Sequence, residues 1–206
     1  MRTLFLVGLL LVLVAVRVIA QCPGDFDHDG TVAINEIVTA GNNSLVGCPT
    51  PGPQFVDNGD GTITDNENGL MWETLSFDDS IHSVTKKYSW NAAVTDKIAK
   101  LNTSSFAGHS DWRLPTIYEL ETLIDYGQSN PSTYAAFNRN CGEPCHIPKG
   151  NCSCTDFSHG PYWSSTEFVT EPSEAWGVLF GGGGGYVSAY DKTLLDAEVR
   201  AVRGGS

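Results

Sequence analysis

Residues 110–120 contain the sharpest helix start in the chain and read Ser110-Asp111-Trp112-Arg113-Leu114-Pro115-Thr116-Ile117-Tyr118-Glu119-Leu120. Thr116 and Glu119 have the spacing of a capping box, in which each side chain bonds to the backbone N–H of the other residue. Pro115 stands just ahead of the cap, and the apolar residues that follow have helical spacing: Leu120, Leu123 and Ile124. The pattern predicts a helix that begins after Thr116 and buries these three side chains.

A second amphipathic helix is predicted earlier in the chain, over residues 89–101. Its apolar residues are Trp90, Ala93, Val94, Ile98 and Leu101. Short strand-like runs lie at 55–56, 62–64, 70–72, 162–163, 175–180, 186–190 and 198–202. Residues 57–61 form a turn signal between the first two runs. Two helices followed by several C-terminal strands predict an α+β domain with an antiparallel sheet.

Residues 1–20 have the pattern of an export signal. Arg2 precedes an apolar run from Leu4 to Val16, and residues 18–20 form a small-residue cleavage pattern. The run is shorter than the roughly 20 apolar residues that a spanning helix needs. We therefore expect cleavage of a signal peptide, a secreted or cell-surface location, and no membrane span in the mature chain. A lipoprotein acylated at Cys22 is the alternative, although Gln21 fits that signal poorly.

The chain is strongly acidic. Its 206 residues include 24 Asp and Glu but only 12 Lys and Arg, which gives a net charge of −12. Removal of residues 1–20 takes away two Arg and no acid, so the charge falls to −14. Binding of duplex nucleic acid depends on Lys and Arg that neutralise phosphates. Nucleic acid is therefore not an expected partner, and sulfated polyanions are disfavoured for the same reason.

Residues 25–36 match the calcium-loop pattern, with acids at its first, third and fifth positions, Gly30 at the sixth and a glutamate at the twelfth. Calcium prefers about six to eight oxygen ligands. The expected Ca²⁺ ligands are Asp25, Asp27, Asp29, the backbone carbonyl of Thr31, and Glu36. The alternative is a solvated acidic turn. A second partial match around Asp60 lacks the first carboxylate, because Val56 stands there, so a plain hairpin turn is favoured.

The calcium loop resembles a single dockerin-type or EF-hand-like repeat. Apolar residues after the loop have the spacing of an exiting helix: Ile34, Ile37, Val38 and Leu45. Dockerins carry two such repeats and use the pair to bind cohesins, whereas this chain has one, so the resemblance implies calcium binding without cohesin docking. Residues 21–48 thus form the predicted calcium module. A Pro-rich linker, 49–54, separates it from a larger domain over 55–206.

Six cysteines follow the signal: Cys22, Cys48, Cys141, Cys145, Cys152 and Cys154. Their even number and the exported setting favour disulfides. A Cys22–Cys48 bond would tie together the ends of the small 21–48 module. The other four cysteines, with His146 beside them, match no common zinc-finger spacing. We expect two disulfides, in which Cys152 and Cys154 each bond to Cys141 or Cys145, because neighbours this close do not pair easily.

Six phrases occur in order along the large domain: FVDNGDGTITD (55–65), GLMW (69–72), SDWRLPT (110–116), YWSST (162–166), AW (175–176) and VRAVR (199–203). Together they resemble the Lcl C-terminal domain family, named for the end domain of a bacterial collagen-like adhesin. The RLPT and VRAVR phrases also resemble the C-type-lectin-like sheet of sulfatase-modifying-factor domains, although their reactive cysteine pair cannot be placed here. The resemblance implies an α+β, C-type-lectin-like domain with an antiparallel sheet, two helices and an adhesin-like role.

Five tryptophans offer aromatic faces suited to sugar rings: Trp72, Trp90, Trp112, Trp163 and Trp176. Each stands in an apolar phrase, so core packing is the favoured role. Arg113 is expected to anchor a turn through hydrogen bonds. Exposed binding residues are expected in loops such as 167–174 and 181–185, although a flexible hairpin tip is the simpler interpretation of the five glycines at 181–185.

No catalytic constellation is marked in the sequence. Ser164 and Ser165 lack the Gly-x-Ser-x-Gly setting of a nucleophile elbow, and no pair of acids is singled out for glycosidase chemistry. We expect a non-enzymatic, calcium-binding surface protein whose large domain recognises a carbohydrate or glycoconjugate. The alternatives are an assembly module that docks to a surface protein through the calcium unit, and an enzyme acting on polysaccharide. Homo-oligomers remain an open possibility.

The calcium loop gives a direct test. Asp25→Ala or Glu36→Ala removes a carboxylate ligand, so we expect either change to abolish Ca²⁺ binding in isothermal titration of the full chain. Asp60→Ala is the control, because the turn around Asp60 is not expected to hold the ion. Unchanged calcium affinity in both loop variants would contradict the assignment.

Overall fold

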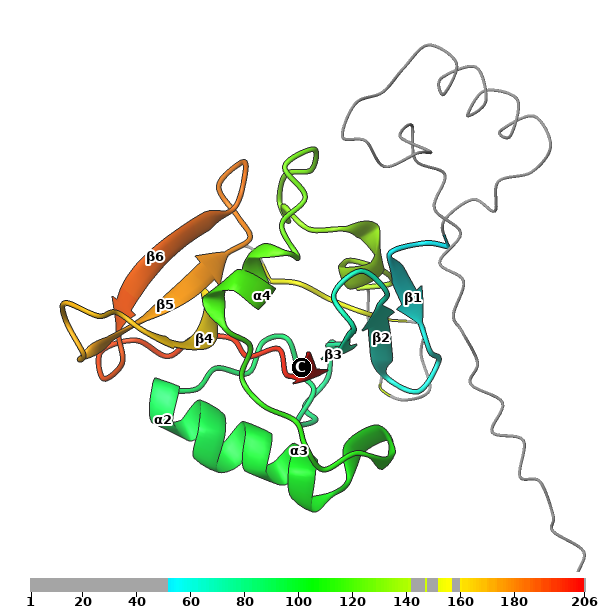
Figure 1. The fold of residues 1–206 in the computed structure, drawn as a ribbon, viewed down its shortest axis with the longest axis horizontal. Helices are drawn as coiled ribbons and strands as arrows, with labels where there is room; N and C mark the ends of the chain where they lie inside the picture. Colours follow the sequence, from blue (N-terminus) through cyan, green and yellow to red (C-terminus); the bar gives the residue numbers. More distant parts are fainter. Residues whose placement is uncertain (1–51, 142–146, 148–151, 157–159, 206) are drawn as a thin grey trace, which may run out of the picture. The chain divides into compact units, whose positions relative to one another are not determined.

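The computed structural model describes residues 52–141, 147, 152–156 and 160–205 (Figure 1). From residue 53 onward these residues belong to one compact unit, Pro53–Ser206. The predicted signal peptide, the calcium module with Asp25, Asp27, Asp29, Thr31 and Glu36, and the cysteines Cys22, Cys48 and Cys145 lie outside the described residues, so the assignments made for them remain predictions. Within the described part of the chain, no helix is long and apolar enough to cross a membrane.

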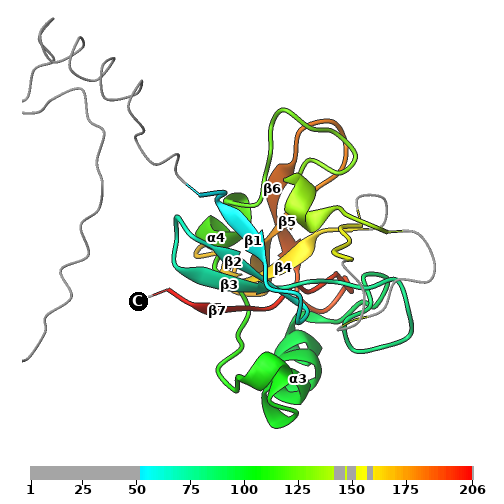
Figure 2. The ribbon, with the colours of Figure 1, turned by 90° about the vertical axis from the view of Figure 1, so that its right-hand side faces the viewer.

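The strands form two antiparallel sheets. The first has the order β1-β2-β3-β7 and contains β1 (Phe55–Asp57), β2 (Thr62–Asp65), β3 (Leu70–Glu73) and β7 (Val202–Gly204). The second has the order β4-β5-β6 and contains β4 (Tyr162–Glu167), β5 (Glu174–Leu179) and β6 (Tyr186–Asp191). Figure 1 shows β4, β5 and β6 apart from β1 and β2, and Figure 2 gives the view turned by 90°. The predicted α+β class with antiparallel strands is confirmed, with two sheets where one was expected.

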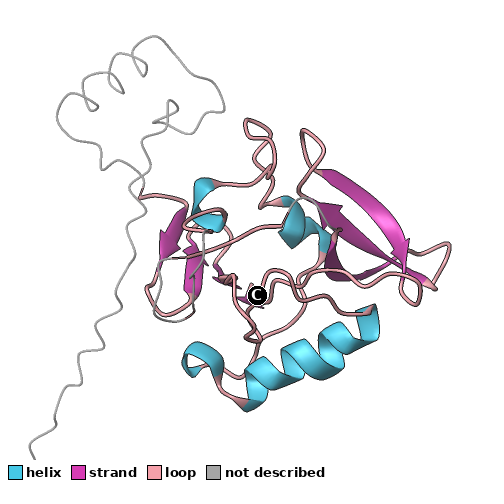
Figure 3. Ribbon diagram, turned by 180° about the vertical axis from the view of Figure 1, so that it is seen from behind, coloured by secondary structure: helices cyan, strands magenta, loops and turns pink. Residues whose placement is uncertain are grey.

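The main helix runs without a break over three segments: α2 (Trp90–Ala92), a π-helical turn η1 (Ala93–Ile98) and α3 (Ala99–Thr103). The side chain of Ser89 caps its start by accepting a hydrogen bond from the Ala92 N–H. The second predicted helix is the short α4 (Ile117–Glu121), which has the complete capping box between Thr116 and Glu119. Two 3₁₀ turns, η2 (Phe106–Gly108) and η3 (Ala135–Phe137), complete the helical elements of the described residues, and loops make up much of the remainder (Figure 3).

The C-terminal strand differs from its predicted position. Residues 198–202 were expected to form it, but the strand is Val202–Gly204. Glu198 instead bonds through its backbone to the neighbourhood of β4, where the Trp163 N–H donates to the Glu198 carbonyl at 3.0 Å and the Glu198 N–H donates to the Pro161 carbonyl at 3.0 Å. The segment before β7 therefore connects the two sheets through isolated bridges.

The predicted turns are confirmed. Asp57–Gly61 joins β1 to β2, and Asp60 accepts hydrogen bonds from the N–H and hydroxyl of Thr62 at 3.0 and 2.6 Å. Because its carboxylate is engaged in this way, Asp60 acts as a turn residue, as favoured. The five glycines at 181–185 form the connection between β5 and β6.

Two hydrophobic clusters form the core. Trp72 and Phe137 belong to the first cluster, and Trp112 and Trp163 to the second. Core packing is thus confirmed for Trp72, Trp112 and Trp163, while Trp90 and Trp176 are half-buried. Several tryptophan N–H groups bond to backbone carbonyls, among them Trp163 to Tyr88 and Trp90 to Ser164, both at 2.8 Å.

A charged cluster lies inside this core. Glu73 at the end of β3 and Lys97 on the helix are both fully buried, and their oxygen and nitrogen atoms are 2.7 Å apart. His82 lies 2.7 Å from the same carboxylate oxygen, and the Ala201 N–H donates to the other at 3.1 Å. Burial acts to raise the pKa of Glu73, but Lys97 and His82 outweigh it and lower this pKa to about 2. Glu73 is therefore an anion that links β3, the helix and the C-terminal segment.

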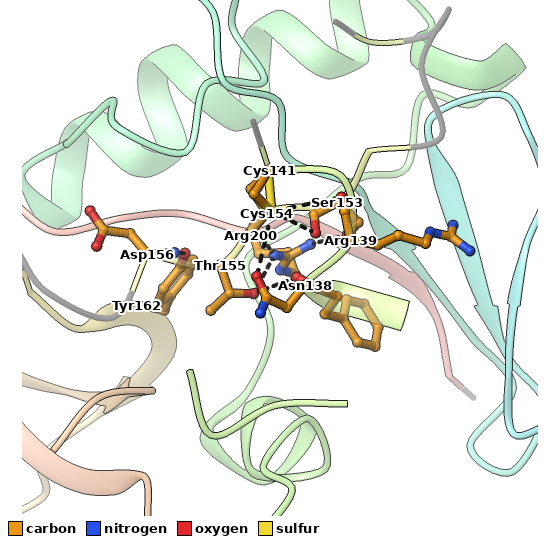
Figure 4. Close-up of a disulfide and its surroundings, with 10 residues drawn as sticks. Asn138, Arg139, Cys141, Ser153, Cys154, Thr155, Asp156, Tyr162 and Arg200 are labelled. Atoms are coloured by element: carbon orange, nitrogen blue, oxygen red, sulfur yellow. Dashed lines mark hydrogen bonds between the residues drawn. A yellow bond between two sulfur atoms is a disulfide. The ribbon is translucent and has the colours of Figure 1, made fainter. Parts of the chain in front are cut away.

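Arg200 forms a second buried cation, beside the disulfide in Figure 4. It donates to the backbone carbonyls of Cys154 at 2.6 Å and Glu73 at 2.8 Å. Cys141 and Cys154 form one of the expected disulfides, and Cys152 is also disulfide-bonded. The bonding pattern favoured over a zinc site is therefore confirmed for Cys141 and Cys154.

Glu198 is another buried carboxylate, and its pKa is shifted in the opposite direction to that of Glu73. Lys87 forms an ion pair with one of its oxygens at 3.4 Å, and neither oxygen has a well-placed hydrogen-bond donor among the described residues. Burial raises the pKa of Glu198 to about 6 from its ordinary 4.5. Ionisation of this side chain therefore opposes folding.

The buried pair gives the first stability prediction. Lys97→Met leaves Glu73 without its closest cation, so we expect the free energy of unfolding to fall by about 3–5 kcal/mol. Lys100→Met, an exposed position on the same helix, is the matched control and is expected to stay within about 0.5 kcal/mol. Urea unfolding at pH 7, followed by tryptophan fluorescence, measures both, because all five tryptophans lie between residues 72 and 176. Equal stabilities would contradict the role given to the pair.

The raised pKa of Glu198 gives the second stability prediction. Glu198→Gln keeps the shape of the side chain without its charge, so we expect a gain of about 2 kcal/mol at pH 7, the equivalent of the raised pKa. Below pH 4.5 the Glu198 carboxyl group is protonated in both the folded and the unfolded chain, so it costs no stability. The cost grows as pH rises from 4.5 through 6, so the gain from Glu198→Gln should vanish below about pH 4.5. Glu171→Gln, on an exposed loop, is the control. A gain that does not change with pH would contradict this account.

Candidate functional site

The segment Trp112–Thr116 is held between the two sheets. Arg113 and Val202 exchange backbone hydrogen bonds of 2.9 and 3.0 Å at the first sheet, and the Ser165 N–H of β4 donates to the Pro115 carbonyl at 2.7 Å. The segment leads directly into α4. Figures 1 and 2 together show α4, this segment and the C-terminal strand on one face of the domain.

An ion pair fixes the geometry of this face. The two terminal nitrogens of Arg113 donate to the two carboxylate oxygens of Glu119, at 2.8 and 2.6 Å, and one of them also donates to the Gly204 carbonyl at 2.9 Å. Glu119 accepts a further bond from the Thr116 N–H at 2.7 Å, which completes the cap. Burial acts to raise the pKa of Glu119, but the hydrogen bonds from Arg113 and Thr116 outweigh it and hold this pKa below its ordinary value. Arg113 is thus confirmed as a turn anchor.

A small pocket of about 230 Å³ lies on one side of the pair. Its lining residues are Asn68, Leu70, Tyr118, Glu119, Thr122 and Gly205. Tyr118 is 77 % exposed and presents an aromatic ring beside polar neighbours. Gly205 has a positive φ of +73°, and a Cβ there would lie 2.8 Å from the Leu70 side chain, so any other residue at this position would be strained.

A larger pocket of about 540 Å³ lies on the other side of the pair. Its lining residues are Val94, Ile98, Trp112, Arg113, Leu114, Thr116 and Ser165. Its walls come from the main helix, the Trp112–Thr116 segment and β4. Volumes of roughly 300–1,000 Å³ are usual for small-molecule sites, as are apolar walls with a few polar groups. The volume of this pocket falls within that range, whereas the volume of the first pocket lies below it.

The chemistry of this face suits binding. Arg113 and Glu119 neutralise one another, so the two pockets have no uncompensated charge among their lining residues. Glu119 is the only carboxylate that lines either pocket, and its lowered pKa makes it a poor proton donor. Among the described residues no group of three His, Cys, Asp or Glu side chains is placed to hold a metal ion.

The sequence predicted binding residues in other parts of the surface. Neither pocket is lined by the loops 167–174 and 181–185, and of the tryptophans only Trp112 contributes, at a buried wall. The residues missed were Tyr118, Asn68, Thr122 and Val94. One signal was present for Tyr118, which is a large aromatic residue on the polar side of a helix whose buried residues include Ile117 and Leu120.

Comparison with known proteins places the chain in a family. Residues 61–203, more than half of the chain, match the Lcl C-terminal domain. No curated protein and no solved structure matches the chain. The family indicates a cell-surface adhesin-like domain, and the Cys141–Cys154 disulfide is consistent with an extracellular or surface location. The phrases around Trp72, Arg113, Trp163 and Arg200 therefore identify the chain as a member of the Lcl C-terminal domain family.

Proposed function

We propose that this adhesin-like domain recognises a carbohydrate or glycoconjugate through the two pockets beside the Arg113–Glu119 pair. The observation that carries the proposal is the exposed ring of Tyr118 next to the amide of Asn68 and the hydroxyl of Thr122. Aromatic faces suit the apolar faces of pyranose rings, while amides and hydroxyls bond to sugar hydroxyl groups.

The rigidity of the pockets supports this proposal. Tyr118 stands on the first turn of a capped helix, and the larger pocket is built on the main helix and a segment bonded to both sheets. A surface of this kind loses little conformational freedom when a ligand binds, so weak contacts to a sugar can yield measurable affinity. Binding without catalysis is proposed, because a glycosidase requires two carboxylates beside its substrate and the pockets offer Glu119 alone.

We also propose that residues 21–48 bind Ca²⁺ through Asp25, Asp27, Asp29, Thr31 and Glu36. The support is the register of the calcium loop in the sequence. This unit is the basis of the alternative function, assembly by docking to a surface protein. Recovery of a protein partner in calcium but not in chelator, through residues 22–48, would favour that alternative.

Tyr118 provides the test of carbohydrate recognition. On a glycan array, we expect the full chain to bind at least one glycan and Tyr118→Ala to weaken that binding about tenfold or more, because a stacked aromatic ring is lost. Tyr126→Ala is the matched control, since Tyr126 is 78 % exposed and lines neither pocket. No binding to any glycan, or equal loss in the two variants, would refute the proposal.

A further inference from the structure

We propose that the larger pocket receives the N-acetyl group of an uncharged oligosaccharide, with a neighbouring sugar ring placed against Tyr118. This inference rests on the proposed carbohydrate recognition and names the ligand class: chains that contain N-acetylhexosamine. Its basis is the division of this face into an apolar pocket and an aromatic pocket that share one wall.

The larger pocket has the apolar walls that an acetyl methyl group requires. Val94, Ile98, Trp112 and Leu114 form these walls. Val94 is 44 % exposed although it is an aliphatic residue, so a ligand can cover it. A sugar hydroxyl placed against these four side chains would find no hydrogen-bond partner among them, whereas burial of a methyl group against them is favourable.

Two polar groups match the two ends of an amide. The hydroxyl of Ser165 donates its hydrogen to the Pro115 carbonyl at 3.2 Å, so its oxygen is left as an acceptor for the amide N–H. Arg113 uses its terminal nitrogens for Glu119, Leu114 and Gly204. Its Nε–H has no partner among the described residues and can donate to the amide carbonyl.

The charges of the pockets and of the whole chain favour an uncharged ligand. Arg113 is neutralised by Glu119 through two hydrogen bonds, so it offers a donor but no net positive charge. The chain as a whole has a net charge of −12. Sulfated or uronic acid chains would meet this negative field with no free cation among the lining residues of either pocket.

The wall shared by the two pockets favours an oligosaccharide over a single sugar as the ligand. Glu119 lines the small pocket, while its partners Arg113 and Thr116 line the large one, so the wall is a single layer of paired side chains. One sugar seated in the larger pocket can therefore be joined to a second that reaches Tyr118.

The experiment compares two matched tetramers, β-1,4-linked N-acetylglucosamine and β-1,4-linked glucose, titrated into the full chain, with a sulfated oligosaccharide as a third probe. We expect the acetylated tetramer to bind at least about fourfold more tightly than the glucose tetramer, the ratio given by one buried methyl group. A smaller ratio, or tighter binding of the sulfated probe, would overturn this inference. Binding to other glycans on the array would then leave the proposed function standing, whereas no glycan binding at all would overturn both.

Variants of the larger pocket test whether it is the source of the preference for the acetylated tetramer. Val94→Asp places a charge in the apolar wall and Ser165→Ala removes the amide acceptor, and we expect either to reduce the ratio of the two affinities. Val169→Asp is the control, because Val169 is 89 % exposed and lines neither pocket. Circular dichroism confirms folding, and Ser165→Ala decides the question if Val94→Asp does not fold. An unchanged ratio in the folded variants would overturn the assignment to this pocket.

Discussion

The buried carboxylate of Glu73 is the constraint on which the rest of the domain depends. A buried anion is tolerated only when several donors surround it, and these donors come from the main helix, the loop at His82 and the backbone of the C-terminal segment. The position of the helix relative to the first sheet is therefore set by charge as well as by apolar contact. Because that helix provides one wall of the larger pocket, the geometry of the candidate site depends on Glu73, which lines neither pocket.

The elements that could be predicted were those with a complete local signal. The capping box at Thr116 and Glu119 and the turn at Asp57–Gly61 were correct because their hydrogen bonds lie within a few residues. The main helix was placed correctly, and its predicted buried face was right at Ala93, Ile98 and Leu101 but not throughout. Val94 was expected inside and is 44 % exposed, while Lys97 is buried. Periodicity assigns a lysine to solvent, and only Glu73, 24 residues earlier in the chain, makes its burial possible.

The candidate site was harder to predict than the helix, because its residues come from distant parts of the chain. Its small pocket combines Asn68 from the turn after β2, Tyr118 from α4 and Gly205 from the end of the domain, and no local pattern brings these three together. Among the pocket residues, Arg113, Thr116 and Glu119 were singled out in advance for structural roles. The Arg113–Glu119 pair combines this structural role with the proposed binding role, because it anchors the turn and also separates the two pockets.

The late position of β7 in the chain has a consequence for folding. Arg200 bonds to the carbonyl of Glu73, and Arg113 bonds to that of Gly204, so contacts span 127 and 91 residues. A ribosome makes the first sheet long before it makes the strand that completes this sheet. The domain therefore cannot close before residue 204 has been made, and contacts over such long sequence separations are expected to slow its folding.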